Sequence, residues 1–128
     1  MTIDASREHW LETYKSLISI SIEGFKFSAL ANGGAAVAIL AYLGNVAGKG
    51  AAVPDMQKPM LAFVLGLFFV GLGMFFSYFT QLKLLEEIGI NESPRLPHGW
   101  VLKLAAFFYV GSLIAFACGS WQAVVRFG

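Results

Sequence analysis

Three long apolar runs constrain what this chain can fold into. They cover about residues 27–47, 60–80 and 100–125, and Lys103 is the only charged side chain within them. A bilayer crossing needs about 20 mostly apolar residues in a helix. Because lipid offers no partners to free backbone amides, each run is expected to be helical. The pattern predicts an all-α integral membrane protein with three transmembrane helices.

The overall composition excludes the other broad classes. Charged residues make up 13% of the chain and hydrophobic residues 57%, whereas soluble domains are about 25% charged. An aromatic content of 15% is too high for a disordered chain. The net charge of +1 gives no long-range attraction for nucleic acid, so membrane lipids are the expected surroundings and no nucleic acid is an expected partner.

The segment before the first run, residues 1–26, has the pattern of an amphipathic helix, interfacial or cytoplasmic, and residues 27–128 form the three-span domain. At about 100° per residue, one face is apolar, with Trp10, Leu11, Tyr14, Leu17, Ile18, Ile22 and Phe25. The opposite face is a polar stripe that contains Glu12, Lys15, Ser16, Ser19, Glu23 and Lys26. Two arrangements fit: an interfacial helix that bends at Gly24, or one continuous helix from Asp4 to Tyr42.

The basic residues predict the orientation. One side of the three spans carries Arg7, Lys15, Lys26, Lys83, Arg95 and Lys103, and the other carries Lys49, Lys58 and Arg126. Basic residues favour the cytoplasmic side, so the N-terminus is expected in the cytoplasm and the C-terminus outside. The stretch from Phe27 to Asn45 resembles stretches in small bacterial membrane proteins, a likeness that implies the bacterial inner (plasma) membrane and no particular activity.

Small residues predict where helices touch. Gly111, Ala115 and Gly119 stand four residues apart in the third run, and Gly33 and Gly34 lie in a run of small residues in the first. Such stripes let neighbouring backbones approach closely in lipid. They serve either the packing of the chain's own three helices or contacts with further copies, and we expect a homo-oligomeric bundle.

The second run mixes glycines with many aromatic rings. This mixture predicts a helix that turns its bulky rings to lipid and its glycines to neighbouring helices.

No constellation of catalytic residues is present, so an enzyme is not expected. His9 and His98 both lie outside the spans, and Cys118 is the only cysteine. Neither haem ligation nor a cysteine-based zinc site is therefore expected. We expect no cofactor and no metal.

Three polar side chains near the first span are the candidate functional residues. Glu23 and Lys26 either form an ion pair at the headgroup level or face the mouth of a pore. Asn32 either hydrogen-bonds across a helix contact or points into a water-filled path. Three spans are too few to enclose a path, so a pore or channel-like assembly would need a ring of copies. The alternative is a non-conducting accessory or assembly subunit of a larger membrane complex, with the N-terminal helix and the loop 86–98 as contacts.

Overall fold

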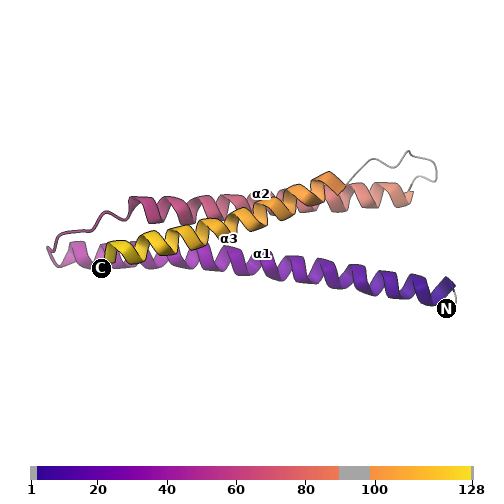
Figure 1. Ribbon diagram of the computed structural model, residues 1–128, viewed down its shortest axis with the longest axis horizontal. Helices are drawn as coiled ribbons and strands as arrows, with labels where there is room; N and C mark the ends of the chain where they lie inside the picture. Colours follow the sequence, from indigo (N-terminus) through magenta and orange to yellow (C-terminus); the bar gives the residue numbers. More distant parts are fainter. Residues whose placement is uncertain (1–2, 90–98, 128) are drawn as a thin grey trace.

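The computed structural model describes residues 3–89 and 99–127, and all regular structure in this part of the chain is helical. The helices are α1 (Ile3–Gly48), α2 (Gln57–Gly89) and α3 (Gly99–Phe127), as Figure 1 shows. Each contains a stretch long and apolar enough to span a membrane. The prediction of three apolar helices is confirmed, and the fold indicates a membrane protein. Residues 90–98, most of the loop considered as a contact, lie outside the described residues.

Helix α1 is continuous from the N-terminal segment through the first span. Its 46 residues correspond to about 69 Å at 1.5 Å per residue, more than twice the thickness of the hydrocarbon layer of about 30 Å. Of the two arrangements that the sequence allowed, the structure has the continuous helix, with no helix end at residue 26. A Cβ at Gly24 would lie 3.2 Å from the Tyr109 hydroxyl, so this glycine admits a neighbouring ring and makes no bend.

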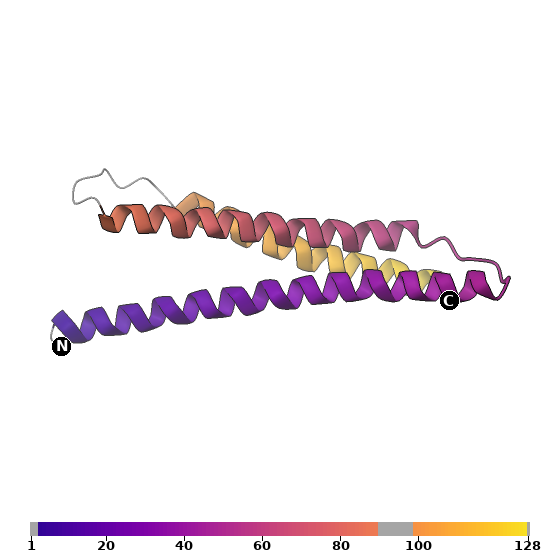
Figure 2. The ribbon, with the colours of Figure 1, turned by 180° about the vertical axis from the view of Figure 1, so that it is seen from behind.

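The three helices are packed unequally. Helix α3 packs mainly against α2, and α1 has fewer contacts with both. We call the end with the start of α1, the end of α2 and the start of α3 the N-terminal end, and the other the C-terminal end. Figures 1 and 2 show α1 close to its partners at the C-terminal end and diverging from them at the N-terminal end.

Buried positions follow one seam along α2. They recur at alternating steps of three and four residues, at Met56 just before the helix and then at Pro59, Phe63, Gly66, Val70 and Gly73. This spacing keeps one face of a helix turned toward its neighbours, as in coiled coils. Helix α2 is therefore the central packing element.

Glycines on this seam and on α3 receive aromatic rings from other helices. A Cβ added to Gly73 would lie 2.6 Å from the Phe25 ring, and one added to Gly119 would lie 2.9 Å from the Phe63 ring. In lipid the hydrophobic effect does not bring helices together, so close packing of this kind drives their association. Replacing either glycine by a larger residue would push two helices apart.

The predicted division of α2 into lipid-facing rings and inward glycines holds in part. Phe68 and Phe75 are 60% and 55% exposed, and Gly66 and Gly73 are buried. Phe63 departs from the pattern because only 2% of it is exposed. Its ring fills the space that Gly119 leaves on α3, so an inward glycine on one helix creates an inward ring on the next.

Polar contacts join α2 and α3 at the C-terminal end. Asp55 caps α2, since its Oδ1 accepts a hydrogen bond from the Gln57 amide at 3.1 Å. The Arg126 guanidinium, at the end of α3, donates to the Asp55 carbonyl and also to Asp55 Oδ2 at 2.8 Å. Arg126 thus connects the end of α3 to the start of α2.

We predict that Arg126→Ala lowers the thermal midpoint of the protein in mild detergent, and that the loss depends on pH. The Gln57 amide and Arg126 together hold the pKa of Asp55 below its ordinary value of 3.8. A lowered folded pKa stabilises the fold above the unfolded value and loses this effect as the pH falls through the folded value. The difference between wild type and variant should therefore narrow below about pH 4. An equal difference at pH 7 and pH 3 would contradict this account.

Candidate functional site

A buried polar cluster lies where the three helices meet. Ser28 and Asn32 come from α1, Ser112 from α3, and the Gly66 carbonyl from α2; the three side chains have no exposed surface. The hydroxyls of Ser28 and Ser112 are 2.7 Å apart, and Ser112 Oγ lies 2.8 Å from the Gly66 carbonyl oxygen, to which it donates. Asn32 Nδ2 donates to the Ser28 carbonyl at 3.0 Å and to Ser112 Oγ at 3.1 Å. One polar cluster therefore connects all three helices.

Gly66 makes room for this cluster. A Cβ at this position would lie 2.1 Å from Asn32 Oδ1, closer than any non-bonded contact allows. The Cα–H of Gly66 is therefore aimed at this oxygen, which is buried and has no conventional hydrogen-bond donor. Contacts of the Cα–H···O kind recur at close helix–helix crossings. The Asn32 side chain thus occupies the space that a side chain at position 66 would fill.

The structure places the three candidate residues in two separate settings. Asn32 hydrogen-bonds across a helix contact inside the chain, which is the first of its two predicted roles. Glu23 and Lys26 form an ion pair of 2.8 Å on the outside of α1, with side chains 69% and 63% exposed. An exposed ion pair in water contributes little to the stability of a fold. The structure does not bring Asn32 together with Glu23 and Lys26.

Most of the small residues singled out in the sequence face the chain's own helices. Gly119 receives the Phe63 ring, and a Cβ at Gly111 would lie 3.0 Å from the Phe69 ring. Between them on α3, Ala115 is half-buried. Gly111 and Gly119 thus serve the internal packing of the three helices.

The two glycines on α1 differ from each other. Gly33 is half-buried, with the Leu67 side chain 3.7 Å from where its Cβ would lie. Gly34 is exposed and has open space around it. Of the five small residues, Gly34 alone is left on the outer surface.

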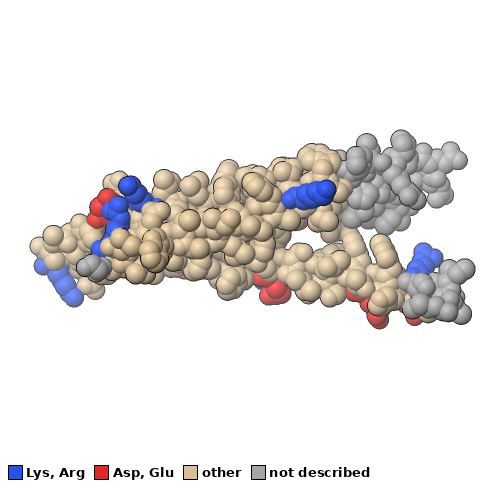
Figure 3. Space-filling view, viewed as in Figure 1, with Lys and Arg blue, Asp and Glu red and all other residues tan. Residues whose placement is uncertain are grey.

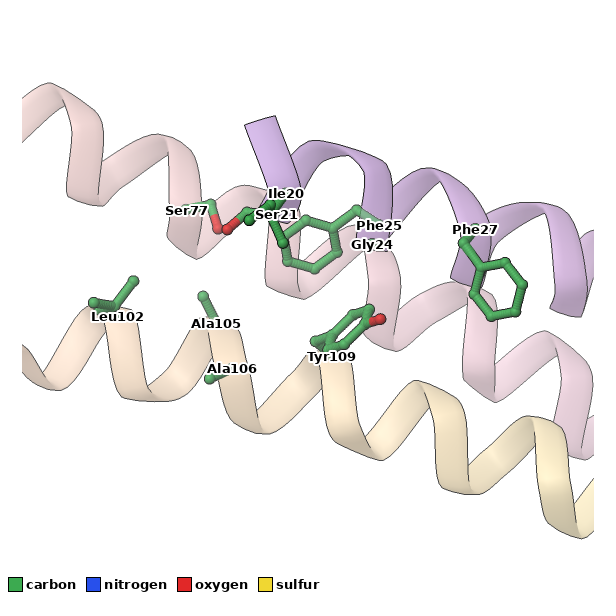
Figure 4. Close-up of a pocket in the computed structure, with 10 residues that line it drawn as sticks. All are labelled: Ile20, Ser21, Gly24, Phe25, Phe27, Ser77, Leu102, Ala105, Ala106 and Tyr109. Carbon is green, nitrogen blue, oxygen red and sulfur yellow. The ribbon is translucent and has the colours of Figure 1, made fainter. Parts of the chain in front are cut away.

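A groove opens between α1 and the α2–α3 pair at the N-terminal end. It consists of two adjoining cavities of about 490 and 450 Å³, which share Ser21, Phe25, Ser77 and Leu102. Figure 4 shows the deeper cavity, with Phe27 at one end, Leu102 and Ser77 at the other, and the rings of Phe25 and Tyr109 between them. The space-filling view in Figure 3 shows a gap between α1 and the α2–α3 pair here. Phe25 is buried and lines both cavities.

The polar groups of the groove gather at its outer cavity. Tyr14 donates a hydrogen bond of 3.1 Å from α1 to Gln81 of α2, and Trp10 stacks on Tyr14 with ring centroids 5.4 Å apart. The sequence placed Trp10 and Tyr14 on the apolar face of the N-terminal segment. It did not indicate that this face turns toward α2 and α3 and leaves space between.

The described residues hold no group of three or more His, Cys, Asp or Glu side chains that could bind a metal ion. Cys118 is exposed. No protein-family model, curated protein or solved structure matches this chain. The buried polar cluster and the groove are therefore the candidate functional features of the described residues.

We predict that Gly66→Ala destabilises the protein by about 1–3 kcal/mol, the usual cost of overpacking a core. The added methyl group must displace Asn32 from its hydrogen bonds. The control is Gly71→Ala on the same helix, where nothing lies within 4 Å. The measurement is the free energy of unfolding in mixed micelles. Equal stability of the two variants would contradict the proposed fit.

We also predict a measurable coupling between Ser28 and Ser112. In a double-mutant cycle with Ser28→Ala and Ser112→Ala, the coupling free energy should be about 0.6 kcal/mol, the average for hydrogen bonds inside membrane proteins. Removing either hydroxyl alone leaves the other without its partner at 2.7 Å. Additive effects of the two substitutions would show that the bond contributes nothing.

Proposed function

We propose that this protein is a non-conducting accessory or assembly subunit of the membrane, and that it offers its long first helix to a partner complex or to further copies. The observation that carries the proposal is the position of the amide and hydroxyl side chains Ser28, Asn32 and Ser112. They lie where the three helices meet, and all three have no exposed surface.

A ring of copies would line any central path with the outer surface of the protomer. On α1, every side chain from residue 29 to residue 41 except Asn32 is apolar or absent. On α2, the same is true of every side chain from residue 60 to residue 76. A path lined in this way dewets and resists ions. This favours the accessory subunit over the pore that the sequence suggested.

Two exposed regions of α1 support a role in assembly. Along its outer face, Gly34, Ala38 and Ala41 are exposed and small, which suits the close approach of another membrane helix. Toward the N-terminal end, α1 exceeds the length of a bilayer crossing and exposes Leu11 and Leu17 at 43% and 59%. The bacterial inner membrane, with the N-terminus in the cytoplasm, remains part of this proposal.

The test is ion flux in liposomes that contain the purified protein. We expect a K⁺ or Cl⁻ flux no higher than that of protein-free liposomes at any protein-to-lipid ratio, because the outer surfaces of residues 29–41 of α1 and residues 60–76 of α2 offer no polar side chain to line a path. A pore-forming peptide in parallel liposomes shows that the assay detects conduction. Flux that rises with protein content and is abolished by Asn32→Leu would overturn the proposal.

A matched pair of variants tests the outer face of α1. Ala38→Leu, on this face, should weaken cross-linking to other chains in native membranes, because the larger side chain prevents close approach. Leu40→Ile, two residues away on an exposed position, is the control and should leave cross-linking unchanged. An equal response of both variants would contradict a role for this face.

A further inference from the structure

We propose that the groove between α1 and the α2–α3 pair holds one acyl chain of a membrane lipid, with the lipid's headgroup toward Tyr14 and Gln81. The inference goes beyond the proposed assembly role and does not depend on it. It assigns a lipid-binding site to the N-terminal end of the bundle.

The lining has the chemistry of hydrocarbon along its depth. Among all residues that line the two cavities, none carries a charge. The deeper cavity is walled by Ile20, Phe25, Leu102, Ala105 and Tyr109. A charged peptide or a charged metabolite would find no oppositely charged side chain here. An acyl chain would make van der Waals contacts with the lining residues and has no hydrogen bonds to lose.

The groove lies at the depth of one leaflet. On α2 its lining residues are Ser77 to Gln81, at the end of the apolar span Gln57–Leu82, and on α3 they begin with Gly99, at the start of the span. Along α1 the lining runs from Trp10 to Phe27. These 17 steps correspond to about 26 Å, slightly more than half of a bilayer that measures about 40–45 Å with its headgroups.

The shape favours a slender occupant over a helix. One helical turn with a diameter of 10 Å and a rise of 5.4 Å occupies about 420 Å³. Cavities of about 490 and 450 Å³ correspond to roughly two turns, less than half of the groove's length of about 26 Å. A single extended chain can fill the whole length.

The polar end of the groove suits the interfacial part of a lipid. Trp10, Tyr14, Thr80 and Gln81 all line the outer cavity, and the deeper cavity has only Ser21, Ser77 and the Tyr109 hydroxyl as polar side chains. Trp and Tyr prefer the headgroup level of a bilayer, where one part of the ring system is wet. A lipid bound in this orientation keeps its polar part next to polar side chains.

The test uses phosphatidylcholine vesicles that contain the full-length protein and a small fraction of phosphatidylcholine with a diazirine on one acyl chain. After illumination, mass spectrometry maps the labelled peptides. We expect labelling of the groove residues Ile20 to Phe25 to exceed that of an exposed reference side chain, Leu61. Ser21 lines both cavities, so Ser21→Phe should fill the groove and lower this labelling about tenfold relative to Leu61.

The matched control is Ser19→Phe, the same substitution at an exposed position outside the groove, which should leave the labelling unchanged. Ala106→Phe fills the groove from α3 and should repeat the effect of Ser21→Phe, so the result does not depend on one helix. Groove labelling no higher than at Leu61, or insensitive to both filling variants, would overturn the proposal. Cross-links from the groove to a second copy, in place of lipid adducts, would also overturn it.

Discussion

The hydrogen-bonded contact among Asn32, Ser112 and the Gly66 carbonyl fixes how the three helices fit together. Inside lipid, an amide without partners is costly because no water replaces the missing hydrogen bonds. Asn32 has its partners on its own helix and on α3, and its Oδ1 lies against Gly66 of α2. Sliding α1 by one turn would separate all of these groups. The Phe25 ring, which lies against Gly73, fits the same register.

The same register determines where the helices part. Two turns from Asn32 toward the N-terminal end, the Phe25 ring lies against Gly73. It meets the Tyr109 ring edge-on, with the ring centroids 5.6 Å apart. Beyond these rings, toward the N-terminal end, α1 diverges from α2 and α3 (Figures 1 and 2). The groove is the consequence, and the Tyr14–Gln81 hydrogen bond spans its outer part. A tight centre and an open end thus belong to one packing arrangement.

Much of the architecture could be predicted from the sequence, because membrane helices are determined by length and hydropathy. Each of the three helices contains one of the predicted spans. The continuity of α1 through Gly24 was only one of two options, since a glycine in a helix is compatible with a bend or with a close neighbour. The partner of Asn32 could not be predicted either, because Ser112 is 80 residues away and nothing local marks it.

The small residues show the same limit. Spacing identified Gly111 and Gly119 as contact positions, but spacing does not distinguish a helix of the same chain from a helix of another copy. The rings of Phe69 and Phe63, which occupy these positions, come from α2. The groove was missed for a related reason: hydropathy predicts an apolar face, and only the angle between helices decides whether that face is covered.

The most direct test of the central contact is a nuclear magnetic resonance measurement of the Asn32 side-chain amide in lipid nanodiscs. A buried amide should show magnetisation transfer to the Gly66 α-protons and to Ser112, and no exchange with water protons. This result would place Asn32 inside the three-helix contact and away from any aqueous path. An Asn32 amide that exchanges with water and lacks contacts to Gly66 would contradict both the packing arrangement and the non-conducting role derived from it.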